Sequence, residues 1–243
     1  MRTALIYLMA LTMAEVATVA LSPMWGMVGH VLIFSAILVH SSFPPRKPLV
    51  LSLSLIPLVR IISLTMPIAD LPQMLWYPII YTPLLAATLV ATRIMGYKRE
   101  DIGATIKLSR TQLAIGLTGI VFGVMEYFIL HPEPLVPDLN WQTLWLPAFI
   151  LLVTTGFTEE LIFRGVLQRT AVETLGNWRG IVYVSFLFAI LHVGFLSWAD
   201  VAFVFAIAMF FGWTVKKTGT LSGVTISHGL TNIMLFIVAP SIF

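Results

Sequence analysis

The sequence has 243 residues, of which 58% are hydrophobic and only 10% charged, and its mean hydropathy is +0.95. Soluble domains usually carry about 25% charged residues, so this chain has too few charges to cover a water-exposed surface. The lack of cysteine excludes disulfides, a cysteine nucleophile and thiolate metal sites. The net charge of +3 indicates membrane topology rather than nucleic-acid binding, and we expect no nucleic-acid partner.

Hydrophobic segments follow one another along the whole chain, and a spanning helix needs roughly 20 mostly apolar residues. The candidate spans are residues 4–22, 24–41, 48–66, 74–96, 112–130, 143–168, 180–196, 199–215 and 220–239. The gaps at 22–24 and 197–199 are so short that eight helices remain an alternative to nine. We therefore expect an all-α, polytopic transmembrane bundle of about 8–9 helices. The longest polar stretch, residues 97–111, predicts an interfacial helix.

Basic residues gather near alternate ends of these spans. They are Arg2, Arg46, Lys47, Lys98, Arg99, Lys107, Arg110, Arg169, Arg179, Lys216 and Lys217. The opposite ends, "SPMW", "PIADLPQ", "HPEPLVPDLNWQ" and "SWAD", contain no lysine or arginine. The positive-inside rule then predicts a multi-pass protein of the cell membrane with a cytoplasmic N-terminus.

Ionisable side chains inside membrane spans are costly, at about 2.5–3.5 kcal/mol each on insertion scales, so they usually have a function or a partner. We expect Arg60 to pair with Glu15 or Glu126, and His30 to be a hydrogen-bonded interior histidine. All four aspartates (Asp70, Asp101, Asp138 and Asp200) fall in predicted loops, which argues against an intramembrane aspartyl dyad. Arg93 lies near a cytoplasmic helix end, where its side chain can reach the interface, and the five remaining groups are Glu159, Glu160, Arg164, His192 and His228.

The stretch "TEELIFR" places Glu160 and Arg164 four residues apart, so they share one helix face and can pair. Glu159 is rotated by about 100° from Glu160 and cannot use the same arginine equally well. This spacing predicts a supporting role for Glu160 and Arg164 and leaves the Glu159 carboxylate available for chemistry.

Two further i,i+4 pairs lie on other spans: Phe188 and His192 in "FAILH", and His228 and Asn232 in "HGLTN". At ~1.5 Å per residue, Glu159, His192 and His228 lie about 15, 20 and 13 Å from the cytoplasmic helix ends, so they can converge. A glutamate and a histidine can activate water, while a second histidine and an asparagine can stabilise an oxyanion.

Two other interpretations of these groups remain open at this point. Glu159, His192 and His228 could instead ligate zinc with one open position, which also activates water. The same side chains could also be separate interior polar clusters that hold helices together. No HExxH and no GxSxG sequence is present, which argues against a zincin-type protease and a serine nucleophile.

At these residues the sequence resembles the family of CAAX proteases and bacteriocin-processing enzymes, which includes the type II CAAX prenyl endopeptidase. Its motifs EExxxR, FxxxH and HxxxN occur here in order, over about residues 145–240. The resemblance implies an intramembrane endopeptidase with a cavity open to the cytosol. Glu159 and His192 would activate water, His228 and Asn232 would hold the oxyanion, and Glu160, Arg164 and Phe188 would support the site.

The resemblance divides the single membrane domain into N-terminal helices with a cytoplasmic interfacial segment, residues 1–111, and a protease-like core, residues 112–243. It implies cleavage of a membrane-associated or lipidated protein or peptide near the cytoplasmic side. It leaves open whether the enzyme is of glutamate type, which we favour, or uses a divalent metal such as zinc. The short chain resembles a prokaryotic member. Alternative functions are a transporter or proton relay, and a non-catalytic scaffold or immunity factor.

Overall fold

The computed structural model describes residues 1–45 and 47–243, so Arg46, one of the predicted cytoplasmic basic residues, lies outside the described part. Within these residues there is no strand, and nine helical segments are long and apolar enough to span a membrane. The all-α transmembrane bundle is therefore confirmed, with nine rather than eight spans. Both short gaps are turns between helices, at residues 21–22 and 196–197.

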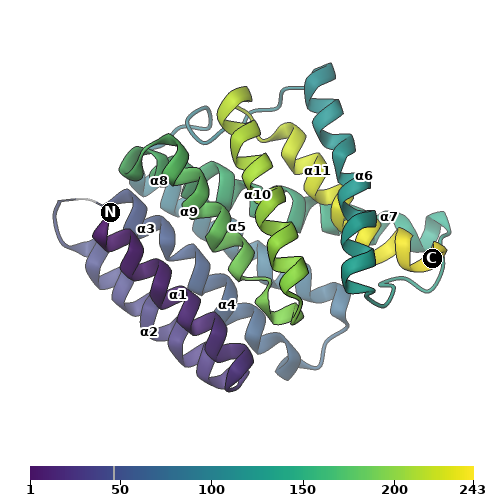
Figure 1. The fold of residues 1–243 in the computed structure, drawn as a ribbon, viewed down its shortest axis with the longest axis horizontal. Coiled ribbons are helices and arrows are strands. Elements are labelled where there is room, and N and C mark those ends of the chain that lie inside the picture. Colours follow the sequence, from purple (N-terminus) through teal and green to yellow (C-terminus); the bar gives the residue numbers. More distant parts are fainter. Residues whose placement is uncertain (46) are drawn as a thin grey trace.

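The helices follow one another with few irregular segments between them (Figure 1). The N-terminal elements are α1 (Arg2–Ala20), α2 (Pro23–Ser42), α3 (Pro48–Leu53), α4 (Leu55–Thr65), η1 (Met66–Ala69), α5 (Gln73–Met95) and α6 (Arg110–Leu130). The remainder are α7 (Trp141–Leu151), η2 (Leu152–Glu159), η3 (Leu161–Leu167), α8 (Gln168–Leu175), α9 (Asn177–Ile190), η4 (Val193–Phe195), α10 (Trp198–Thr218), α11 (Ser222–Ile233), η5 (Met234–Val238) and α12 (Ala239–Ile242). Elements α7 to α8 form one continuous span, as do α11 to α12.

The N-terminal helices are joined by a buried charge cluster that the sequence predicted only in part. The carboxylate of Glu15 lies 2.7 Å from Nε of Arg60 and 3.1 Å from Nε2 of His30. Glu15 and His30 are completely buried, whereas the Arg60 side chain is 16% exposed. Of the two predicted partners, Glu15 is the one that forms an ion pair with Arg60. Glu126 lies elsewhere in the bundle.

The predicted interfacial helix at residues 97–111 is wrong, because residues 97–109 form turns and extended backbone. The segment packs back on the bundle instead. The backbone carbonyl of Gly103 accepts a hydrogen bond of 2.9 Å from the amide of Leu221, and the carbonyl of Thr105 accepts one of 2.6 Å from the Thr220 hydroxyl. Ile102 is buried under this loop. Tertiary hydrogen bonds and the left-handed backbone at Gly103 therefore replace helical ones.

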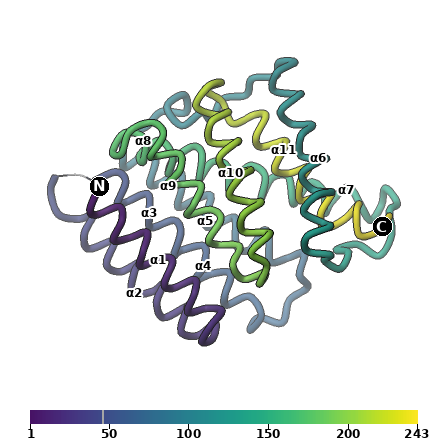
Figure 2. Tube along the Cα trace, viewed as in Figure 1, coloured from purple at the N-terminus to yellow at the C-terminus, as the bar shows by residue number. Residues whose placement is uncertain are grey.

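Close backbone contacts hold α11 between α6 and η2, and α6 and α11 run side by side in Figures 1 and 2. Gly119 of α6 faces the carbonyl of Ser227 so closely that a β-carbon there would overlap with it. A β-carbon on Gly156 of η2 would lie 2.9 Å from the carbonyl of Thr225 and 3.0 Å from Cα of Gly229. Small residues let membrane helices approach closely, and here they fix the depth and rotation of α11.

The span that carries "TEELIFR" is not the regular α-helix expected over residues 143–168. It is π-helical over η2 and η3, with Glu160 between the two segments. The Thr158 hydroxyl donates to the carbonyl of Val153, five residues earlier, and Thr155 donates to Leu151. Such side-chain bonds to the backbone bend helices, and π-helical turns are frequent at functional sites. The wider turns change how successive side chains are directed around the helix.

Candidate active site

Glu160 and Arg164 form the buried base of the site. Nη1 of Arg164 lies 3.4 Å from Oε1 of Glu160, and the two side chains are 1% and 0% exposed. The guanidinium also lies over the ring of Phe188, with 4.4 Å from Cζ to the ring centroid. An aromatic face attracts a cation, so Phe188 helps to hold Arg164 in place. The i,i+4 spacing thus predicted this pair correctly, although its helix is π-helical.

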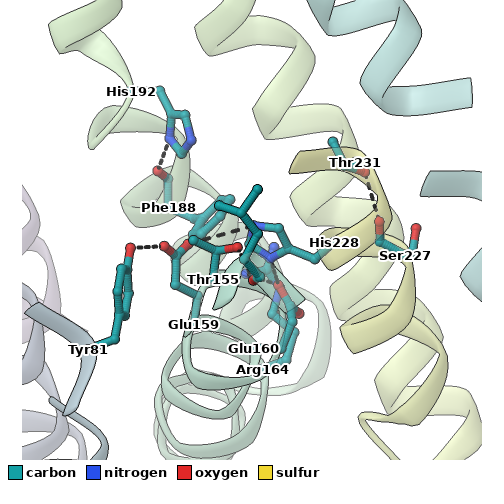
Figure 3. Close-up of polar contacts among 11 residues, drawn as sticks. Tyr81, Thr155, Glu159, Glu160, Arg164, Phe188, His192, Ser227, His228 and Thr231 are labelled. Atoms are coloured by element: carbon teal, nitrogen blue, oxygen red, sulfur yellow. Dashed lines mark hydrogen bonds and ion pairs between the residues drawn. The ribbon is translucent and has the colours of Figure 1, made fainter. Parts of the chain in front are cut away.

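Glu159 is directed away from this pair, as Figure 3 shows: Tyr81 lies on one side of its carboxylate and His228 on the other. The Tyr81 hydroxyl donates a short hydrogen bond to Oε1. Oε2 lies 3.8 Å from Nε2 of His228. The Glu159 side chain is 17% exposed whereas that of Glu160 is completely buried, so the two adjacent carboxylates have different environments.

His228 connects the two glutamates. Its Nδ1 lies 2.8 Å from Oε1 of Glu160, and because a carboxylate accepts, Nδ1 is the donor. Nε2 is then directed toward Glu159, and it carries a proton when the ring is an imidazolium. A carboxylate that orients a histidine in this way is a recurring arrangement in catalytic sites. The glycine contacts of α11 provide the rigid backbone on which this ring is placed.

His192 lies just beyond the C-terminal end of α9 rather than inside a helix, which corrects the predicted span of 180–196 for the α-helix proper. Its Nδ1 is 3.1 Å from the carbonyl oxygen of Phe188 (Figure 3). A carbonyl can only accept, so Nδ1 carries the proton, and in the neutral ring Nε2 keeps a lone pair. Nε2 is therefore able to accept a proton from water.

One cavity of about 230 Å³ brings the predicted catalytic residues together. Glu159, His192, His228 and Asn232 all line it, and Phe188 lies on the same wall. Glu160 and Arg164 are not on the lining, which agrees with a supporting position beneath it. Residues from all three motifs, which lie on three separate spans, therefore line the same cavity.

The arrangement does not fit a three-ligand metal site. Nowhere in residues 1–45 and 47–243 do three histidine, aspartate or glutamate side chains gather closely enough to hold one ion. Nδ1 of His228 is bound to Glu160 and Nδ1 of His192 to the Phe188 carbonyl, so that only Nε2 of each ring could ligate a metal. We therefore derive no step through a metal, and the zinc set of Glu159, His192 and His228 stays a prediction for metal analysis to test.

Three other polar groups near the site were not among the predicted site residues. Tyr81 is neither charged nor part of one of the three motifs, so neither criterion selects it. The spacing of Tyr77 and Tyr81, four residues apart on one face of a membrane helix, could have indicated that both line the site. Glu126 lines the same cavity. Asp200 is fully buried beside Glu126 in the first turn of α10, which Ser197 caps, so its predicted position in a loop is wrong.

Comparison with known proteins gives one result. The family model described as "Type II CAAX prenyl endopeptidase Rce1-like" matches residues 139–234. The matched part runs from the start of α7 to the end of α11 and contains all three motifs. No curated protein and no solved structure matched the chain.

Proposed function

We propose that this multi-pass membrane protein, whose residues 139–234 form an Rce1-like domain, hydrolyses a peptide bond inside the membrane with a water activated by Glu159 and His192. The Rce1-like family supports a CAAX-type intramembrane endopeptidase in general, and therefore a protein or peptide substrate. The observation that carries the specific proposal is the cavity that Glu159, His192, His228 and Asn232 line together.

In the proposed reaction, a water in the cavity gives a proton to Glu159 or His192 as its oxygen attacks the scissile carbonyl carbon. His192 is suited to this step because Phe188 fixes the proton on Nδ1 and leaves Nε2 as acceptor. Tyr81 holds the Glu159 carboxylate in one orientation. A positioned base of this kind contributes typically about 10²–10⁴-fold to a rate.

The carbonyl oxygen becomes negatively charged in the tetrahedral intermediate, and hydrogen-bond donors are required to stabilise this charge. The carboxamide of Asn232 and, as imidazolium, Nε2 of His228 provide them from the same wall. When the C–N bond breaks, the proton taken from water passes to the leaving amine. Glu160 and Arg164 support this step because Glu160 orients the His228 ring and Arg164 balances the Glu160 charge.

The test uses purified protein in detergent or liposomes and an anchored peptide reporter. Wild-type protein should release the cleaved fragment, and Glu159→Gln and His192→Ala should lower kcat/KM by at least about 100-fold without unfolding. Glu133→Gln, in the exposed loop before α7, is the matched control and should keep full activity. Full activity of Glu159→Gln would refute the mechanism. Proton or solute flux into liposomes without cleavage would favour the transporter alternative instead.

Metal content of the same samples separates the two catalytic types. A glutamate-type enzyme should retain its activity after chelator treatment and contain less than one equivalent of zinc. Loss of activity with chelator, and recovery when zinc is added to wild type but not to His192→Ala, would assign the metal-dependent type.

A further inference from the structure

One carboxyl group on the wall of the main cavity is not used by the proposed reaction. The side chain of Glu126 in α6 lines this cavity together with the predicted catalytic residues. Glu126 lies outside residues 139–234, so the match to the family assigns it no role. A carboxyl group inside a membrane span is costly, and Glu126 therefore needs a function or a partner.

The partner of Glu126 is a second carboxyl group. Glu126 is 6% exposed and forms a hydrogen bond with the side chain of Asp200, which is completely buried. Carboxylates only accept hydrogen bonds, so a bond between two carboxyl groups requires a proton on one of them. Both oxygens of Asp200 lack any other donor among residues 1–45 and 47–243, and no basic side chain there forms an ion pair with either group. The pair therefore holds one proton and one negative charge.

The helix ends decide which of the two carboxyl groups carries the proton. Asp200 is the third residue of α10, and the N-terminal end of a helix stabilises a negative side chain in its first turn. Glu126 lies four residues before Leu130 at the C-terminal end of α6, where the partial negative charge of the helix disfavours a carboxylate. Both ends therefore favour the negative charge on Asp200 and the proton on Glu126.

Helix α11 is held between two elements that contact opposite faces of it. α6 packs closely on Ser227 and Thr231, whereas η2 packs closely on Thr225 and Gly229. At about 100° per residue, these two faces are about 160° apart around α11. The proposed oxyanion donors of the same helix project between the two faces.

A substrate carbonyl group bound by these donors, His228 and Asn232, would therefore have a carboxyl group on either side. Glu159 belongs to η2, and Glu126 belongs to α6. Glu159 accepts a hydrogen bond from Tyr81, as a carboxylate does, whereas Glu126 carries a proton. Two carboxyl groups whose environments differ in this way are suited to act as base and acid in one reaction.

We propose that Glu126 is the general acid of the reaction and gives its proton to the leaving amine nitrogen as the C–N bond breaks. This inference rests on the proposed function. Glu126 becomes a carboxylate in this step, and the proton that Glu159 or His192 took from water then restores it. A small cavity of about 30 Å³, lined by Glu126, His192 and Asn232 among others, has room for about one water that can carry this proton. Asp200 is a positioning residue that keeps the proton on Glu126.

Two reporter peptides test this role, with an amide at the scissile bond in one and a phenyl ester in the other. A leaving amine needs a proton, whereas a leaving phenolate does not. Glu126→Gln should lower kcat/KM for the amide by at least about 100-fold and leave the ester nearly unchanged. The new amide can still donate to Asp200, so this substitution retains the buried contact. Glu159→Gln should lower both activities, and Glu133→Gln, the same change in an exposed loop, should lower neither.

Equal losses on the two reporters, or full activity of Glu126→Gln on the amide, would overturn the general-acid role. A wild-type protein that cuts neither reporter would instead refute the proposed function. The proton on Glu126 is measured separately, as an infrared band of a protonated carboxyl group near neutral pH that Glu126→Gln lacks. Absence of this band overturns the assignment whether or not a peptide is cut.

Asp200→Asn is the second variant, and it also serves if Glu126→Gln does not fold. It removes the like charge that keeps Glu126 protonated and offers a donor to the Glu126 carboxylate. We expect the same loss confined to the amide reporter. Full activity of Asp200→Asn on the amide would show that Asp200 does not control the proton and would overturn its positioning role.

Discussion

Replacing Glu160 and Glu159 separately by glutamine tests whether the two adjacent carboxylates have separate tasks. Glu160 is completely buried, and its Oε1 contacts both Nδ1 of His228 at 2.8 Å and Nη1 of Arg164 at 3.4 Å. Glu160→Gln would leave the Arg164 charge buried without its partner. Breaking a buried ion pair costs about 3–5 kcal/mol, so the ratio of folded to unfolded protein should fall roughly 100-fold to several thousand-fold.

Glu159→Gln is the matched control for this experiment, because the chemical change is the same one residue away. The Glu159 side chain is 17% exposed to the cavity, and an amide oxygen can still accept from Tyr81. We expect a change in the free energy of unfolding of less than about 1 kcal/mol, together with the loss of cleavage described above.

Both values can be measured by unfolding in mixed detergent micelles, followed by the fluorescence of the seven tryptophans. A third protein with both Glu160→Gln and Arg164→Met should lose clearly less stability than the sum of the two single changes, because it no longer buries an unpaired charge. Additive losses, or equal losses for Glu159→Gln and Glu160→Gln, would refute the assignment of Arg164 to Glu160.

Three further outcomes follow from single contacts. Tyr81→Phe should lower kcat/KM by roughly 10- to 100-fold, because it removes a hydrogen bond to a charged group, which is worth about 1.5–3 kcal/mol. Tyr77→Phe, on the same cavity wall, is the control and should have a smaller effect. Gly119→Ala should destabilise the bundle by about 1–3 kcal/mol, whereas Gly194→Ala, with open space around its β-carbon, should be nearly neutral in an unfolding titration. Tyr97 lies outside the membrane spans, and burial together with a hydrogen bond to Glu173 raises the pKa of its phenol. The contribution of this residue to the free energy of unfolding should be present below about pH 10 and lost as the pH rises further. Tyr97→Phe should therefore flatten that part of the profile of unfolding free energy against pH.

The amino-acid sequence alone was sufficient to predict the class of fold and to select most residues of the candidate site. Long apolar runs can satisfy their backbone hydrogen bonds in a bilayer only as helices, so hydropathy was enough to predict the transmembrane bundle. Local spacing predicted the Glu160–Arg164 pair, because residues four apart in a helix lie on one face whatever the rest of the chain does. The motif residues were identified by their order and spacing along the chain.

Tertiary structure decided the contacts between helices that are distant in sequence. The Tyr81 hydroxyl reaches Glu159 across 78 positions of the chain, and no local pattern encodes that contact. The polar segment 97–109 resembled a helix in composition, but its hydrogen bonds go to Thr220, Leu221 and Ser222 on another turn. The hydrophobic pattern of a helix predicts which residues face inward, whereas only the packing of the helices decides which of those residues meet.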